Sequence, residues 1–201
     1  MTTDAGRLRR ELTNLPNLLT YARIVAIPAC VLFLGRGDPK SSYVACAIYV
    51  VAGATDYFDG WLARRMNLTS VLGKFLDPLA DKLFVMAALI LLVHLGRVPA
   101  WLVVIVLARE MAITGLRSIA SAEGMVIGAG YTGKLKTALQ MVALCFLLIH
   151  YEYTIHFVIV SVQLDMQAVG LPMLYLSVFF SLWSAAEYFT GFFRHLSDVP
   201  G

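Results

Sequence analysis

The hydrophobic residues of this chain gather into long, nearly uninterrupted runs separated by short polar segments. A helix needs about 20 predominantly apolar residues to cross a membrane, so runs of this length indicate transmembrane helices. Six such runs can be drawn, at residues 18–34, 43–63, 79–95, 100–122, 135–150 and 169–193. Turn signals rich in glycine and proline separate them at 35–40 and 96–99. The pattern predicts an all-α integral membrane protein, a bundle of six transmembrane helices.

The composition supports a membrane protein and excludes three other classes. The chain is 59% hydrophobic and 14% charged, whereas soluble domains average about 45–50% and about 25%. This excludes a soluble globular enzyme, a disordered chain and a secreted disulfide scaffold. Its 201 residues are filled by six spans and short loops, so we predict a single membrane domain, 1–201. The apolar stretch 157–162 is too short to cross and is predicted to be interfacial.

The basic residues are divided unevenly between the two sides of this bundle. Only Arg36, Lys40 and Arg97 fall on one side. The other side holds eleven: Arg7, Arg9, Arg10, Arg64, Arg65, Lys74, Lys82, Arg117, Lys134, Lys136 and Arg194. The positive-inside rule therefore places both termini in the cytoplasm, and the net charge of +3 indicates cytoplasmic loops rather than nucleic acid binding. Within the N-terminal segment 1–14, residues 4–14 form either a juxtamembrane amphipathic helix or a solvated basic tail.

Four aspartates surround the junction of the second and third runs. On a helix, Asp56 and Asp59 share a face, and Gly73, Asp77 and Asp81 form one stripe at intervals of four. If these spans pack as an antiparallel hairpin, the two faces can meet. Four facing carboxylates cannot all stay ionised without a counter-charge, and two Mg²⁺ or Mn²⁺ ions suit carboxylate oxygens. The alternative is a solvated loop in which the aspartates pair with Arg64, Arg65, Lys74 and Lys82.

A second polar group indicates an anion site. Arg109 lies inside an apolar run, where a charge needs a partner. Glu110 points about 100° away on a helix, so we expect Arg109 to face another group, and Arg117 shares its broad face. Together with Lys134 these arginines can form a cationic pocket for a phosphate. The alternative is a structural Arg–Glu pair with lysines that only follow the positive-inside rule.

The aspartates also carry a resemblance to a known family. The string Asp56-x2-Asp59-Gly60-x2-Ala63-Arg64-x8-Gly73-x3-Asp77-x3-Asp81 resembles, at all eight specified positions, the signature of the CDP-alcohol phosphotransferases. The resemblance implies six membrane helices, a homodimer, and attack of an alcohol on a CDP-linked donor with release of CMP. It implies that Asp56, Asp59 and Asp77 are metal ligands, and that Asp81 lies at the metals as the candidate general base.

The same resemblance assigns residues to the donor, CDP-diacylglycerol. The segment 16–23 resembles the family's N-terminal nucleotide-site segment. The donor residues implied are Asn17, Thr20, Arg23, Gly60, Ala63, Arg64 and Gly73. Considered alone, Arg23 is equally explained as an arginine that reaches from a helix end to the interface. No serine, cysteine or histidine stands at a matched position, so we expect direct attack without a covalent intermediate.

The acceptor is indicated by three further segments. Residues 108–117, 133–141 and 181–184, together with Tyr188, resemble bacterial phosphatidylglycerophosphate synthases, a branch of this family. This resemblance implies glycerol 3-phosphate as the acceptor, held by Arg109, Arg117 and Lys134, and an active site on the cytoplasmic side of the bacterial inner membrane. Inositol phosphate or another alcohol is the alternative acceptor. In a different class, the aspartates would be the ion site of a divalent-cation transporter.

Overall fold

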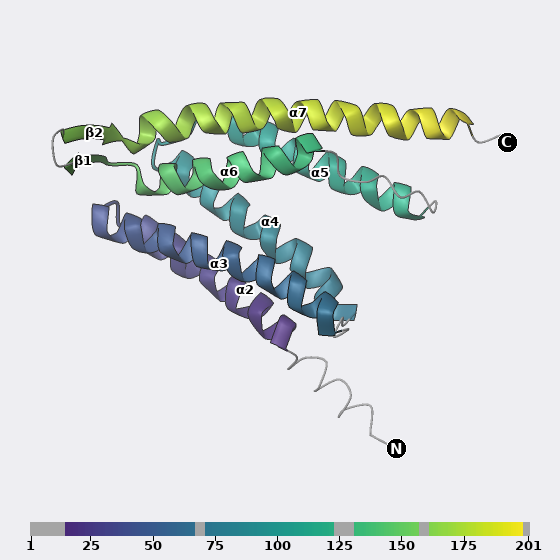
Figure 1. The fold of residues 1–201 in the computed structure, drawn as a ribbon, viewed down its shortest axis with the longest axis horizontal. Helices are drawn as coiled ribbons and strands as arrows, with labels where there is room; N and C mark the ends of the chain where they lie inside the picture. The colour runs from purple at the N-terminus through teal and green to yellow at the C-terminus, as the bar shows by residue number, and fades with distance from the viewer. Residues whose placement is uncertain (1–14, 67–70, 123–130, 157–160, 199–201) are drawn as a thin grey trace, which may run out of the picture. The chain divides into compact units, whose positions relative to one another are not determined.

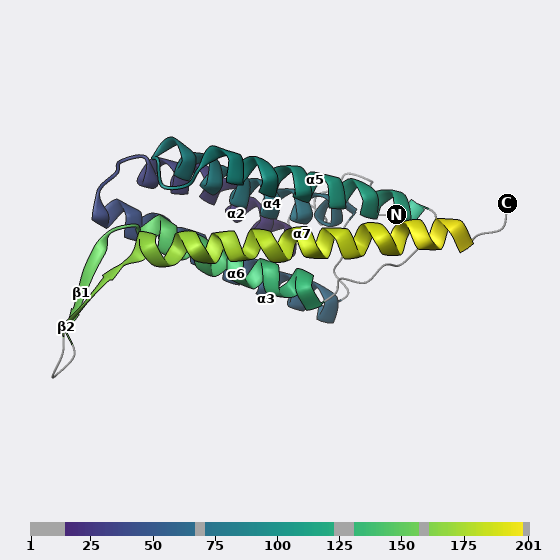
Figure 2. The same cartoon turned by 90° about the horizontal axis from the view of Figure 1, so that it is seen from above.

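The structure is a computed structural model that describes residues 15–66, 71–122, 131–156 and 161–198, with side chains for 18–55, 79–122, 132–154 and 163–194. The predicted amphipathic or basic segment 4–14 lies outside the described residues. The elements are α2 (Leu15–Leu34), α3 (Pro39–Met66), α4 (Val71–His94), α5 (Ala100–Ala122), α6 (Tyr131–Ile149), β1 (Glu152–His156), β2 (Ser161–Asp165) and α7 (Met166–Asp198). Figures 1 and 2 show them as two groups of long helices, the second with a hairpin.

Each of the six predicted runs lies on one of these helices. The helix α5 has the predicted bounds, whereas α4 begins eight residues earlier than predicted and α7 is longer at both ends. The difference arises because hydropathy follows the apolar middle of a helix, while backbone hydrogen bonding continues through polar ends such as Lys74 to Asp77. Within the described residues, two helices are long and apolar enough to cross a membrane, at Thr132–Ile149 and Met166–Arg194.

The turn between α2 and α3 is built from the residues that predicted it. Gly37 has φ +72°, a left-handed conformation that glycine adopts without a steric penalty. Asp38 caps α3, because its Oδ2 accepts a hydrogen bond from the Ser41 amide at 2.9 Å, and Pro39 occupies the first helical position. Hydrogen bonds from Ser41 hold the pKa of Asp38 below its ordinary value. The start of α3, the helix that carries two of the aspartates, is therefore well defined.

The chain divides into two compact units, Met1–Leu95 and Gly96–Gly201. In the first unit, α2 packs against both α3 and α4. The rings of Tyr49 on α3 and Phe84 on α4 stack with centroids 5.3 Å apart, and both side chains are buried. Cys30 and Cys46 are also buried and Cys145 is half-buried, and all three are reduced thiols that pack as small apolar residues.

In the second unit, α7 packs against α6 and α5. Gly170 on α7 allows a close approach to α6: a Cβ there would lie 2.9 Å from Cγ of Leu147 and 3.1 Å from its backbone nitrogen. Contact between α5 and α7 is made by a small cluster of Ile113, Ala185 and Tyr188, with Leu116 packed against it. These contacts bring the second polar group of the sequence onto facing helices.

The connection between α6 and α7 corrects the all-α prediction. The strands β1 and β2 form an antiparallel hairpin in which Tyr153 pairs with Leu164 and Ile155 with Val162. Residues 157–160, most of the stretch predicted to be interfacial, lie outside the described residues. The strand segments read Glu-Tyr-Thr-Ile-His and Ser-Val-Gln-Leu-Asp. This strict alternation of polar and apolar positions is the signal of a strand.

Arg97 joins the start of α5 to the end of α6. Its Nη1 donates hydrogen bonds to the carbonyl oxygens of Leu148 at 2.9 Å and Leu147 at 3.3 Å, and its guanidinium lies over the ring of Tyr151. Burial lowers the pKa of Arg97 from its ordinary value. The Gln167 side chain of α7 donates to the Arg97 carbonyl at 2.6 Å. This basic residue is therefore a structural clamp within the second unit.

Candidate functional site

The helices α3 and α4 carry the aspartate signature. Asp56 lies seven residues after Tyr49, and Asp77 lies seven residues before Phe84. Seven residues are about two helical turns, a rise of roughly 10 Å and a rotation within about 20° of the same face. Because the four residues 67–70 join α3 to α4, the two helices run in opposite directions. Helical geometry therefore predicts that positions 56 and 77 lie at one level, on the faces that the stacked rings occupy.

The side chains of the signature are mostly outside the described set, including those of Asp56, Asp59 and Asp77. Asp81 is described and is exposed. Among the side chains that the structure describes, no group of three His, Cys, Asp or Glu residues could hold a metal ion. A site at this level would have an all-carboxylate donor set, which suits Mg²⁺ or Mn²⁺. The structure also does not describe the side chains of five predicted donor residues, Asn17, Gly60, Ala63, Arg64 and Gly73.

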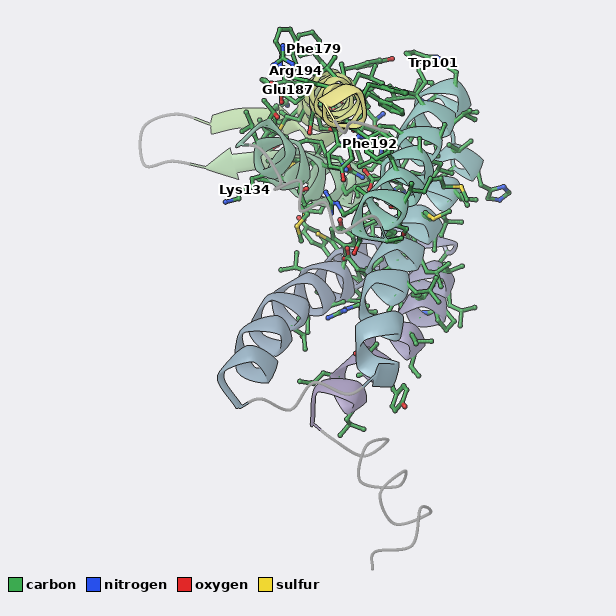
Figure 3. The ribbon with its side chains drawn as sticks, turned by 90° about the vertical axis from the view of Figure 1, so that its right-hand side faces the viewer. Trp101, Lys134, Phe179, Glu187, Phe192 and Arg194 are labelled. Carbon is green, nitrogen blue, oxygen red and sulfur yellow. The ribbon has the colours of Figure 1, made fainter. Side chains whose placement is uncertain are left out.

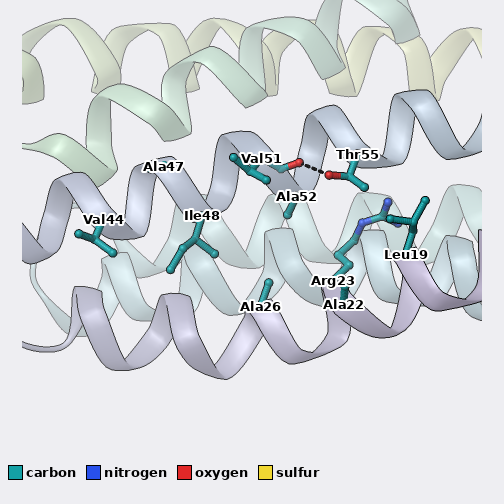
Figure 4. Close-up of a pocket in the computed structure, with 10 residues that line it drawn as sticks. All are labelled: Leu19, Ala22, Arg23, Ala26, Val44, Ala47, Ile48, Val51, Ala52 and Thr55. Atoms are coloured by element: carbon teal, nitrogen blue, oxygen red, sulfur yellow. Dashed lines mark hydrogen bonds between the residues drawn. The ribbon is translucent and has the colours of Figure 1, made fainter.

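The two described donor residues lie on α2. Thr20 is 1% exposed and Arg23 is 3% exposed, so both polar side chains are buried in the first unit. They are three residues apart and thus share a face of the helix. Figure 4 shows Arg23 at one end of a cavity of about 370 Å³ between α2 and α3. The burial of Arg23 argues against the alternative in which this arginine merely reaches to the interface.

In the second unit, Arg109 is held by α5 itself and by α7. Its Nη1 donates to Oε1 of Glu110 at 2.9 Å, and its Nε donates to the Ser181 carbonyl at 3.0 Å. The expectation that Arg109 would face a group other than Glu110 is therefore wrong in part. Adjacent residues diverge by about 100° at the backbone, but two long side chains can curve back and meet. The remaining N–H groups of the Arg109 guanidinium are the candidate donors to a bound anion.

The lysine that joins this group is Lys136. Its ammonium pairs with the same Oε1 of Glu110, and the residue is 7% exposed. Lys134, the lysine predicted for the phosphate site, is exposed and points outward from α6 in Figure 3. Positions 134 and 136 differ by about 200° on a helix, so only one can face α5. Arg109 and Lys136 are thus brought together, while the structure does not bring Lys134 into the same cluster.

Arg117 and two hydroxyls extend this cluster along α7. The Arg117 guanidinium lies over the Tyr188 ring, 5.8 Å from its centroid. The Tyr188 hydroxyl and the Ser181 Oγ are buried and have no hydrogen-bond partner within the part of the chain that the structure describes. Buried hydroxyls are costly without a partner. Arg109, Arg117 and these two hydroxyls form a cluster of hydrogen-bond donors that suits a phosphorylated ligand.

Glu187 has a structural role at the start of α6. Its Oε2 accepts a hydrogen bond from Thr132 at 2.8 Å, and its Oε1 accepts one from the indole of Trp183 at 2.8 Å. A Cβ on the neighbouring Gly133 would lie 3.3 Å from the Ser184 Oγ. These contacts fasten the first turn of α6 to α7. Lys134 and Lys136 follow directly in sequence, so Glu187 fixes the segment that presents them.

Sequence reasoning did not assign Lys136, Ser181 or Tyr188 to the site. The sequence alone does not distinguish Lys136 from Lys134, because the choice depends on the rotation of α6 about its own axis. For Ser181 and Tyr188 a usable signal exists, because they lie seven residues apart and therefore share one face of α7.

Comparison with known proteins identifies the family of this chain. Three similar proteins are named CDP-diacylglycerol–glycerol-3-phosphate 3-phosphatidyltransferase. The Bacillus subtilis protein is 41% identical over 88% of this chain and 94% of its own length. The Rickettsia bellii protein is 40% identical over 68% and 75%, and the Shigella flexneri protein is 34% identical over 92% and 98%. Residues 13–183 match the family model described as CDP-alcohol phosphatidyltransferase. The chain belongs to the CDP-alcohol phosphatidyltransferase family.

Proposed function

We propose that this protein transfers the phosphatidyl group of CDP-diacylglycerol to glycerol 3-phosphate, giving phosphatidylglycerol phosphate and CMP. The observation that carries the proposal is the near full-length similarity of this chain to the Bacillus subtilis protein named CDP-diacylglycerol–glycerol-3-phosphate 3-phosphatidyltransferase. The second unit supports the choice of acceptor, because Arg109 and Arg117 lie along one face of α5 against α7. Such a face suits the phosphate that distinguishes glycerol 3-phosphate from serine or choline.

In the proposed reaction, a hydroxyl oxygen of glycerol 3-phosphate attacks the phosphatidyl phosphorus. The new P–O bond forms as the bond to CMP breaks, and Asp81 accepts the hydroxyl proton. Asp56, Asp59 and Asp77 would hold two divalent cations, Mg²⁺ or Mn²⁺, which when bound neutralise the diphosphate and stabilise the leaving oxygen. Arg64 binds the diphosphate through its fork of donors, and Asn17, Thr20 and Arg23 position the cytidine end. Gly60, Ala63 and Gly73 give the donor room to approach the backbone.

The acceptor is held by the second unit in this proposal. Arg109 and Arg117 bind the phosphate, and Lys134 adds an exposed cation from α6. Glu110 and Lys136 position Arg109 rather than contact substrate, since Glu110 accepts from both cations. Binding the phosphate orients the attacking hydroxyl, and through this orientation the binding energy increases the reaction rate.

An acceptor competition tests the proposal. Purified protein is supplied with CDP-diacylglycerol, Mg²⁺ or Mn²⁺, and equal glycerol 3-phosphate, inositol phosphate, glycerol and serine, and the lipid product is identified by mass. Phosphatidylglycerol phosphate as the main product supports the proposal, and another headgroup contradicts it. Release of CMP that requires both substrates excludes the divalent-cation transporter. Exchange of labelled CMP into CDP-diacylglycerol without acceptor would contradict direct attack.

We also propose the setting of this activity. The family match covers both compact units, which favours one functional domain, 1–201. The similarity to bacterial proteins favours a bacterial inner membrane, and the basic residues favour an orientation in which both termini and the active site face the cytoplasm. The six-span topology and the homodimer implied by the family resemblance stay predictions.

A further inference from the structure

The cavity between α2 and α3 is apolar except at one end. Eight of its ten lining residues are alanine, valine, leucine or isoleucine. The two exceptions, Arg23 and Thr55, lie at the same end in Figure 4. The Thr55 hydroxyl donates to the Val51 carbonyl at 2.5 Å, so it is already used within its own helix. A sugar or a nucleobase would find few hydrogen-bond partners along this cavity, whereas a hydrocarbon chain needs none.

The dimensions of the cavity suit one acyl chain. Along α3 its lining runs from Val44 to Thr55, a distance of roughly 16 Å at 1.5 Å per residue. This is about half of the roughly 30 Å hydrocarbon core, the depth of one leaflet. The volume of about 370 Å³ is created where both helices present small side chains. These are Ala22 and Ala26 on α2, and Ala47 and Ala52 on α3.

The polar end of the cavity is the end at which the family signature begins. Thr55 directly precedes Asp56, the first aspartate of the signature. Arg23, which is buried at this end, supplies a positive charge beside a lipid phosphate. A lipid whose diphosphate is bound at the signature would thus find the apolar cavity leading away from its headgroup.

We propose that this cavity binds one acyl chain of the CDP-diacylglycerol donor, with the ester end beside Arg23 and Thr55 and the chain end toward Val44. This inference rests on the proposed function. It assigns the preference for donor chain length to the residues halfway along α3, above all Ala47. Neither Ala47 nor Ala26 is part of the catalytic or phosphate-binding machinery, so both can be changed without altering the chemistry.

The test fills the cavity halfway along its length. Ala47 lies eight residues from Thr55, roughly 12 Å along the helix, whereas a six-carbon chain covers only about a third of one leaflet. Ala47→Phe should therefore raise the KM for dioleoyl CDP-diacylglycerol by about tenfold and change the KM for the dihexanoyl donor by less than twofold. Val50→Phe is the matched control on α3, because Val50 is 49% exposed and does not line the cavity. Equal effects of Ala47→Phe on both donors would overturn the inference.

A second measurement does not depend on turnover. A CDP-diacylglycerol with a photoreactive group at the end of one long chain should crosslink to residues 44–48 of the wild-type protein, and Ala26→Phe should reduce this labelling. Equal labelling by a phosphatidylcholine carrying the same group would show that bulk lipid occupies the cavity and would overturn the inference. Failure of the proposed function gives a different result, the absence of CMP release with glycerol 3-phosphate from either donor.

Discussion

Lys136 on α6 and Glu110 on α5 form a hydrogen-bonded ion pair, and the carboxylate oxygen that Lys136 contacts also accepts a hydrogen bond from Arg109. One glutamate thereby holds two cations from two helices. The arrangement fixes the Arg109 guanidinium while leaving part of its donor fork for a ligand. It also makes Lys136 part of the structure, so that the two lysines of this segment can be separated by experiment.

Replacement of Lys136 by methionine should destabilise the protein, whereas replacement of Lys134 should not. Lys136→Met removes a hydrogen bond between charged groups, with an expected loss of about 1–3 kcal/mol in the free energy of unfolding. Lys134 is exposed, and Lys134→Met should change stability by no more than about 0.5 kcal/mol. Thermal unfolding of both variants in the same detergent measures the difference. Equal melting temperatures would contradict the role assigned to the ion pair.

Neutralising the proposed phosphate site should act mainly on the acceptor. Arg117→Ala removes a charge-assisted hydrogen bond worth roughly 1.5–3 kcal/mol, so kcat/KM for glycerol 3-phosphate should fall about 10- to 150-fold. Lys134→Ala should have a smaller effect in the same direction. The KM for CDP-diacylglycerol should stay nearly constant in both variants. A purely structural role would lower activity toward both substrates alike, and an unchanged KM for glycerol 3-phosphate in both variants would contradict the phosphate site.

The signature aspartates should be essential for turnover and dispensable for membrane insertion. Asp56→Ala, Asp59→Ala and Asp77→Ala should each reduce CMP release by several orders of magnitude at saturating Mg²⁺ or Mn²⁺, because each removes a metal ligand. Removing one of several neighbouring carboxylates relieves repulsion, so the proteins should still insert. Asp38→Ala, in the turn before α3, serves as the control for loss of an aspartate. Near-normal activity of any signature variant would contradict the assignment.

Two glycines of α7 should respond oppositely to alanine. At Gly170 a Cβ would meet Leu147 and Phe146 of α6 at 2.9–3.1 Å, including a backbone nitrogen that cannot easily move. Gly170→Ala should therefore cost about 1–3 kcal/mol. At Gly191 a Cβ would meet nothing within 4 Å, so Gly191→Ala should stabilise the helix by about 0.5–1 kcal/mol. Unfolding curves of the two variants would show shifts of opposite sign, and a stabilised Gly170→Ala would contradict the close packing of α6 on α7.

The helices of this fold could be predicted from sequence because long apolar runs are compatible with few structures other than a helix. Features that depend on pairing between distant segments were harder to predict. The hairpin of β1 and β2 was missed although its alternation is visible, since a search for runs that cross a membrane passes over five-residue strands. In the same way, the signature of Asp56 to Asp81 is local and readable, whereas the partner of Arg109 depends on how far two side chains reach.

The choice between Lys134 and Lys136 shows where sequence reasoning ends. Both lysines belong to one short segment and both fit a cationic pocket. Their directions differ by about 200°, and only the packing of α6 against α5 and α7 decides which faces inward. That packing is fixed in part by Gly133 and Glu187, whose contacts span more than 50 residues of sequence.

The hairpin that joins α6 to α7 also indicates where α7 enters the hydrocarbon core of a membrane. Two strands leave two unpaired edges, whose amide and carbonyl groups cannot lie in hydrocarbon, so the hairpin marks one water boundary. The apolar stretch of α7 that follows, Met166–Arg194, has 29 residues and a length of roughly 43 Å, against about 30 Å of hydrocarbon. Counted from Met166, we expect the helix to leave the hydrocarbon near residue 186. We therefore expect Tyr188 and its neighbour Arg117 to lie at the opposite boundary, where a water-soluble phosphate ester can reach a lipid-borne partner.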